Sequence, residues 1–307
     1  MKKYLIIASL IIIGIIGIGY NLNKNKIPAQ SSVPIQKISE KNDETQAFSF
    51  DNTGDSQDDI NPTYPTPSTE INFDKINIQT ITTTEQLQQL FPKFYLYAVS
   101  PIFIEQFPVD FPEKGNINLF VKAMMPLILR EQNNILADRE FLLSLNQKPY
   151  LDWTNVERAR FDALIQKYEL TKEKLSVSQM DELLKRVDII PMSLVLAVSG
   201  IHTNWGQKNL TAPFGQKEWV KGKYIDKQFD LLGDAVHAFM HELNTLAIYA
   251  PMRTARQTNR HLKGSLGEKL LSHIDNYMRE NPTYERQIKD AFKTLKLGVL
   301  DEALLFE

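Results

Sequence analysis

The chain has 307 residues, of which 43% are hydrophobic and 23% are charged, and its formal net charge is −2 at pH 7. This near-neutral balance excludes the strongly basic surface of nucleic-acid-binding proteins, so we expect no nucleic-acid partner. The sequence contains no cysteine. Disulfide bonds, thiolate metal sites, a cysteine nucleophile and a lipid anchor on an N-terminal cysteine are therefore excluded.

Residues 4–20 form an uncharged apolar run that follows the basic start of the chain. As a helix this run would span roughly 26 Å, slightly less than the ~30 Å hydrocarbon core of a membrane. Tyr4 and Tyr20 would then lie at the two membrane interfaces, where tyrosine is enriched. The alternative is a cleaved signal peptide, but no clear small-residue cleavage site follows. We predict a retained signal anchor over residues 1–20, with the body of the protein outside the cytoplasm in either case.

Residues 21–70 are rich in Ser, Thr, Asn, Asp, Gln and Pro and show no apolar periodicity. A segment of this kind cannot bury enough apolar surface to offset the entropy lost on ordering. We predict a disordered linker with a root-mean-square reach of roughly 40 Å, which would let the following domain leave the bilayer surface.

From residue 71 to residue 307 the composition is that of a globular domain, and apolar residues recur mainly at helical spacing. One stretch, 217–230, alternates and contains a glycine, which predicts a short hairpin. The pattern therefore indicates a mostly α fold of the α+β class. The predicted helices are 85–90, 116–145 (one helix or a helix pair), 155–169, 176–186, an apolar helix after Pro191, 231–246, 264–280, 282–295 and 297–305.

The central stretch of this domain is 187–219, which begins with an apolar helix and continues into a Trp-Gly and a Phe-Gly turn. Pro191 suits a first helical turn, where its missing N–H has no consequence. Gly206 is placed to end the helix, since glycine accepts the left-handed conformation common at helix C-termini. His202 then lies in the last turn, where a largely buried helix could present it at the mouth of a cleft.

Trp205-Gly206 and Phe214-Gly215-Gln216 carry a resemblance to the Bax-type proteins of the mannosyl-glycoprotein endo-β-N-acetylglucosaminidase-like family, the peptidoglycan glucosaminidases of glycoside hydrolase family 73. Their motif resembles an apolar helix followed by Glu-Ser-x-Trp-Gly and then Asn-Leu-Phe-Gly. His202 stands where the family has its catalytic glutamate, and Thr203-Asn204 and Ala212-Pro213 also depart from the motif. The resemblance extends over residues 111–306. It implies a lysozyme-like helical domain with a small β-hairpin lobe, and hydrolysis of β-1,4 bonds at N-acetylglucosamine.

Replacing the glutamate by His202 predicts impaired or lost catalysis. Glycoside hydrolysis needs a neutral acid that protonates the leaving oxygen and then stands as an anion beside an oxocarbenium-like centre. A histidine can donate a proton only as a cation, so its charge has the wrong sign throughout the step. Two hypotheses remain open: a cell-wall hydrolase, active or residual, and a catalytically dead relative that binds glycan strands or a wall-synthesis partner.

A carboxylate on the predicted hairpin could stand in for the missing acid. Glu218 is the best placed by sequence and is the candidate second acid, with Asp226 and Asp230 as weaker candidates. The alternative is that all three are solvated loop charges, since most Asp and Glu side chains are exposed.

Five aromatic residues could form a floor for sugar rings. For Trp205 and Phe214 packing in the core is the favoured interpretation, because large aromatic side chains beside a buried helix usually belong to the core. Tyr277 and Tyr284 are candidates for the cleft through the family resemblance alone. The substrate-binding set predicted here is Trp205, Phe214, Trp219, Tyr277 and Tyr284.

His237 and His241 are separated by one helical turn, a spacing that can bind a metal from a single helix face. Nothing in the sequence places His202 beside them, and we interpret them as ordinary helix histidines, so neither a metal nor a cofactor is expected. The predicted partners are peptidoglycan glycan strands, the inner membrane through the N-terminal helix, and a cell-wall protein. The predicted location is the inner membrane, single-pass, with the domain in the periplasm, or secretion if the N-terminal segment is cleaved.

Overall fold

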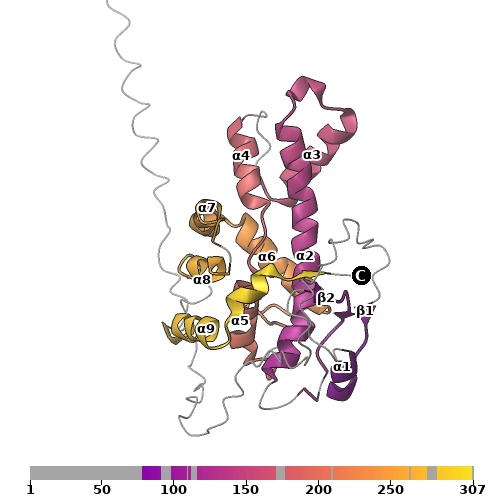
Figure 1. Ribbon diagram of the computed structural model, residues 1–307, viewed down its shortest axis with the longest axis vertical. Helices are drawn as coiled ribbons and strands as arrows, with labels where there is room; N and C mark the ends of the chain where they lie inside the picture. The colour runs from indigo at the N-terminus through magenta and orange to yellow at the C-terminus, as the bar shows by residue number, and fades with distance from the viewer. Residues whose placement is uncertain are drawn as a thin grey trace, which may run out of the picture. The chain divides into compact units, whose positions relative to one another are not determined.

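The computed structural model describes residues 78–90, 98–108, 110–111, 116–170, 177–208, 210–262, 264–274 and 282–305, all of them within the unit that spans residues 44–307 (Figure 1). The predicted signal anchor over 1–20 and the predicted linker over 21–70 lie outside the described residues. Among the helices that are described, none has the length and apolar character needed to cross a membrane.

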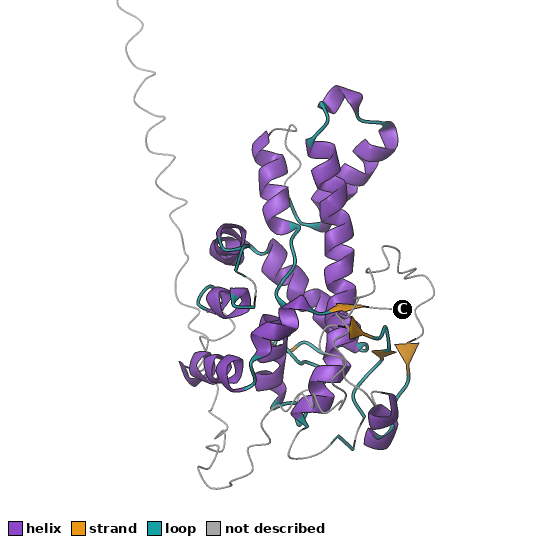
Figure 2. Ribbon diagram, viewed as in Figure 1, coloured by secondary structure: helices purple, strands orange, loops and turns teal. Residues whose placement is uncertain are grey.

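The described part of the chain is mostly helical with three small two-stranded sheets, as expected for the α+β class (Figure 2). Most helices lie within a few residues of their predicted ranges. They are α1 (Thr84–Leu90), α2 (Ile117–Asn146), η2 (Tyr150–Asp152), α3 (Asn155–Lys167), α4 (Val177–Arg186), α5 (Met192–Thr203), α6 (Leu232–Thr245), η3 (Ala247–Tyr249), α7 (Ala250–Thr258), α8 (Leu266–Leu271), α9 (Pro282–Thr294) and η5 (Leu297–Glu302).

The segment 116–145, predicted as one helix or a pair, is the single long helix α2, which contains Pro126. Two C-terminal predictions were wrong in part. The helix predicted over 264–280 is only the short α8 where the structure describes it, and the helix predicted over 297–305 is the 3₁₀ helix η5 followed by the strand β6 (Leu304–Leu305).

Helix α5 lies at the centre of the described fold, where it contacts α2, α8, α9 and η5 (Figure 1). Ten of its twelve residues are buried, and only Ile201 and His202 reach partial exposure. A helix that is apolar on all faces gains stability by burial on all faces. This packing fixes the direction in which its last turn points.

The N-terminus of α5 is capped by a side chain from η5, more than a hundred residues further along the chain. The backbone N–H of Ser193 donates to Oδ1 of Asp301 at 2.8 Å, and the Ser193 hydroxyl donates to Oδ2 at 2.9 Å. Burial raises the pKa of Asp301 to about 6, although the hydrogen bonds from Ser193 oppose this shift. Asp301 thus satisfies a helix end that water cannot reach.

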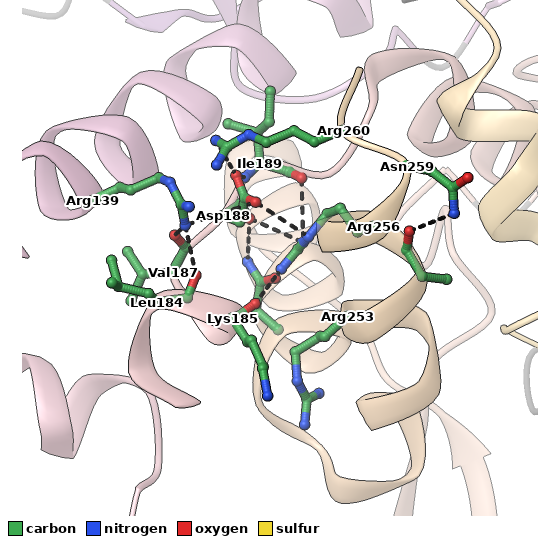
Figure 3. Close-up of polar contacts among 12 residues, drawn as sticks. Arg139, Leu184, Lys185, Val187, Asp188, Ile189, Arg253, Arg256, Asn259 and Arg260 are labelled. Carbon is green, nitrogen blue, oxygen red and sulfur yellow. Dashed lines mark hydrogen bonds and ion pairs between the residues drawn. The ribbon is translucent and has the colours of Figure 1, made fainter. Parts of the chain in front are cut away.

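The segment between α4 and α5 is held by a cluster of arginines around the buried carboxylate of Asp188, which we call the Asp188 cluster (Figure 3). Arg260 donates to Asp188 at 2.8 Å, and nitrogens of Arg139 and Arg256 lie 3.7 and 3.8 Å from the same carboxylate. These arginines come from α2, from α7 and from the residues just after α7.

Two of these arginines also bind the carbonyls at the end of α4. Arg139 donates to the carbonyls of Leu184 and Val187, and Arg256 donates to that of Lys185 at 2.7 Å. Cations at a helix C-terminus satisfy the free carbonyls and oppose the helix dipole. The Asp188 cluster therefore joins α2, α4 and α7 at the point where the chain enters α5.

The predicted hairpin over 217–230 is confirmed as β4 (Lys217–Val220) and β5 (Lys223–Asp226), an antiparallel pair. Its turn residues Lys221 and Gly222 both have positive φ, as a tight two-residue hairpin turn requires. Two further sheets were not predicted. They are short parallel pairs of β1 (Ile78–Gln79) with β3 (Phe103–Ile104) and of β2 (Ala98–Val99) with β6.

We expect Asp188→Asn to lower the free energy of unfolding by about 3 kcal/mol, because it leaves buried arginines without their counter-charge. Urea denaturation of the full chain at pH 7 measures this. Glu182→Gln is the matched control, since Glu182 pairs with Lys185 and Arg186 at the surface and should change stability by less than about 0.5 kcal/mol. Equal effects of the two substitutions would contradict the role given to Asp188.

Candidate functional site

Helix α5 ends earlier than the sequence predicts. Its last residue is Thr203, and Asn204, Trp205 and Gly206 follow with φ of 49°, 56° and 96°. The prediction that Gly206 ends the helix was therefore wrong in position, because Asn204 is the first left-handed residue. Asparagine tolerates this conformation better than most residues. Trp205 and Gly206 of the motif then complete a tight left-handed turn.

The indole of Trp205 folds back onto α5. A Cβ on Gly200 would lie 2.4 Å from this ring, so the close approach requires glycine. The indole also meets Phe120 of α2 edge-on, with ring centres 5.8 Å apart. Trp205 is partly buried against the core, in agreement with the packing interpretation favoured from the sequence.

The side chain of His202 is enclosed by two segments that are distant in sequence. Its ring lies against the backbone of Gly215, where an added Cβ would be 2.4 Å from Cε1. Tyr284 of α9 covers it with ring centres 4.7 Å apart, and the Tyr284 hydroxyl is 3.1 Å from Nδ1. Nε2 of His202 is buried, and no described residue hydrogen-bonds to it.

This enclosure lowers the pKa of His202 to about 4. The main cause is burial, which disfavours the charged imidazolium, and the positive charge of Lys217 acts in the same direction. The negative charge of Asp226 raises the pKa of His202, but by less than burial and Lys217 lower it. His202 is therefore a neutral imidazole at pH 7.

One face of the β4–β5 hairpin carries the two charged groups that act electrostatically on this imidazole. Lys217 and Asp226 face each other across the two strands and form an ion pair, and Trp219 and Tyr224 are the next pair on the same face. Because side chains alternate along a strand, Glu218 projects from the opposite face and is exposed. Of the carboxylates weighed from the sequence, Asp226 is the one that acts electrostatically on His202.

Trp219 and Tyr224 form an exposed aromatic pair. Their side chains are 60% and 52% exposed, and their rings meet at 67° with centres 4.7 Å apart. Trp219 was a predicted site residue, whereas sequence analysis missed Tyr224. The turn at Lys221-Gly222 is the signal that could have found it, because a two-residue turn there places residue 224 opposite residue 219.

The remaining predicted aromatic residues differ in their environments. Phe214 is fully buried and stacks on Phe239 of α6 with ring centres 4.3 Å apart, which matches the packing interpretation. Tyr277 lies outside the described residues. Asp230 is exposed beyond β5, and its backbone carbonyl accepts from Gln106. The structure thus brings His202 and Tyr284 together and leaves Phe214 in the core.

Comparison with known proteins gives one relative. Over 166 residues the chain is 28% identical to the protein named "Protein bax" of Escherichia coli (strain K12), which corresponds to 50% of this chain and 58% of that protein. This chain is a distant relative of Protein bax. No family model matches the sequence, and no solved structure matches the fold. The relationship supports the Bax-type resemblance, whereas the chain spans little more than half the length of this relative.

The enclosure of His202 predicts different effects of alanine at two glycines with positive φ. Gly215→Ala should lower the free energy of unfolding by about 2–4 kcal/mol, through backbone strain and the clash with the imidazole. Gly222→Ala is the matched control, since nothing lies within 4 Å of an added Cβ there, and it should cost only about 1 kcal/mol.

Adding His202→Ala should recover part of the loss caused by Gly215→Ala, and none of that caused by Gly222→Ala, because only the first clash involves the imidazole. Urea denaturation of the five variants, which are the three single and the two double substitutions, measures the coupling. Additive effects at residues 202 and 215 would contradict the contact.

Proposed function

We propose that this chain is a Bax-type protein of the cell envelope that binds peptidoglycan on a glucosaminidase-like, lysozyme-like helical scaffold, and that it has lost hydrolysis through the central position of the motif. The observation that carries the proposal is the state of His202, which is neutral and enclosed. A neutral imidazole bonded to Tyr284 is no source of a proton for a glycosidic oxygen at pH 7.

The exposed aromatic pair supports a binding role. Sugar rings present flat apolar faces, and an aromatic side chain that is more than half exposed offers a surface of the same kind. Trp219 and Tyr224 share a hairpin face with the Lys217–Asp226 pair, which lies close to His202. We propose that this face contacts N-acetylglucosamine-containing glycan strands, with Tyr284 beside it.

A second candidate is residual glucosaminidase activity, favoured by the position of Asp226. Its carboxylate acts on His202 and could take the role of the acid, whereas Glu218 lies on the other face of the hairpin. Against this, the carboxylate of Asp226 is already engaged in an ion pair with Lys217.

The proposed location follows from the sequence. The apolar run over 4–20 would anchor the chain in the inner membrane, and the segment over 21–70 would let the domain reach the wall from the periplasmic side. A wall-synthesis protein is the alternative partner if glycan binding is absent.

We expect the purified full chain to sediment with sacculi and to produce no clearing in a peptidoglycan zymogram. Trp219→Ala and Tyr224→Ala should each weaken sedimentation about tenfold, since the loss of a large exposed aromatic contact is worth on the order of 1.4 kcal/mol. Leu151→Ala is the control, because Leu151 is 85% exposed on η2, far along the chain from the hairpin.

Two results would overturn the proposal. Sedimentation that is unaffected by both aromatic substitutions would remove the hairpin as the binding surface. Clearing by the unaltered chain that disappears in Asp226→Asn but persists in Glu218→Gln would show hydrolysis and assign the acid to Asp226.

A further inference from the structure

His237 and His241 occupy one face of α6, and each has one ring nitrogen already committed to an oxygen acceptor. Their ring centres are 5.7 Å apart with an interplanar angle of 34°. The His237 side chain is half exposed, and His241 is partly exposed. The pair is therefore open to solvent on one side.

The tautomer of His241 follows from its partner. Nε2 lies 2.7 Å from the backbone carbonyl oxygen of Lys167, at the end of α3. A carbonyl oxygen only accepts, so Nε2 must carry the hydrogen. In the neutral ring the lone pair is then on Nδ1, and no described residue hydrogen-bonds to that atom.

His237 is arranged in the complementary way. Its Nδ1 lies 2.9 Å from Oε1 of Glu131, a nearly buried carboxylate of α2. The carboxylate accepts the Nδ1 hydrogen, which leaves Nε2 with the lone pair when the ring is neutral. Metal-binding histidines commonly donate their second ring N–H to a carboxylate or a backbone carbonyl, and this bond fixes the tautomer.

We propose that His237 and His241 bind a divalent transition-metal cation, with Glu131 and the Lys167 carbonyl as the supporting outer shell. Two imidazoles that share a tetrahedral zinc, with Zn–N bonds of about 2.0–2.1 Å, have ring centres roughly 5 Å apart. The observed 5.7 Å is close to this value.

The site supplies two protein ligands. In the part of the chain that is described, no group of three or more His, Cys, Asp or Glu side chains is arranged to hold a metal. Water or an external ligand would therefore complete the coordination. Imidazole ligands favour Zn²⁺, Ni²⁺ or Cu²⁺ over Mg²⁺ and Ca²⁺, which prefer oxygen.

The outer shell also links the site to the fold. Glu131 belongs to α2 and Lys167 to α3, while both histidines belong to α6. A metal that fixes the two rings would strengthen both hydrogen bonds at once. Binding to the folded state alone should therefore raise the melting temperature of the chain.

Calorimetric titration of the untagged, metal-free full chain with Zn²⁺ alone tests the proposal. We expect one saturable site per chain and a rise in melting temperature at saturation. His237→Ala and His241→Ala should each weaken zinc binding at least tenfold. Glu131→Gln should weaken it about tenfold, which is the smallest loss of metal affinity usual when an outer-shell partner is removed.

The chain has five histidines, and His261→Ala and His273→Ala are the matched controls, in which binding should be unchanged. A thermal unfolding curve recorded in the presence of a chelator verifies that every variant is folded without metal. Absence of saturable binding in the unaltered chain would overturn the proposal. Binding by the His237→Ala or His241→Ala variant as tight as that of the unaltered chain, or loss of binding in either control, would also overturn it.

Discussion

The near-complete burial of α5 governs how the elements around it are arranged. A helix enclosed on all sides has backbone groups at both ends that water cannot satisfy, so other elements must satisfy them. At the first end this is done by Asp301. At the last end the carbonyl of Gly200 accepts from the N–H of Trp205 at 2.6 Å, and the carbonyl of Thr203 accepts from the N–H of Lys208 at 2.8 Å. The Asp188 cluster fixes the chain just before the helix begins. These polar contacts link α5 to elements throughout the second half of the chain.

The same constraint sets the chemistry of His202. Because α5 is fixed by its packing, the side chain of His202 in its last turn is held against Gly215 and Tyr284. In this confined position a glutamic acid would be neutral and able to donate a proton, since burial raises carboxyl pKa values. The same burial lowers the pKa of a histidine. One environment would therefore keep a carboxylic acid protonated and keep a histidine neutral.

Much of this arrangement could be predicted from the sequence. The amphipathic repeat of 155–169 made α3 predictable, and the apolar run after Pro191 made α5 predictable. The hairpin followed from its alternation and its glycine. These are local signals, in which each residue's preference and its position agree.

What could not be predicted depends on contacts between distant residues. The capping of α5 by Asp301 joins residues 108 apart in the sequence, and the covering of His202 by Tyr284 joins residues 82 apart. The arginines around Asp188 also come from other elements of the chain. The parallel strands have only two residues each, which is too short to show a sequence pattern. They form only because a partner strand lies beside each of them. Asn204 in left-handed conformation was missed because the adjacent Trp-Gly was the stronger local signal.

Enclosure holds His202 in its neutral form, and an NMR titration of the imidazole measures this state. The full chain labelled with ¹⁵N, with His202→Gln used for assignment, gives the ring-nitrogen shifts from pH 8 downward. We expect a ring that stays neutral through pH 6 and titrates with a pKa of about 4. A pKa near 6.5, the ordinary value for a solvated histidine, would contradict it.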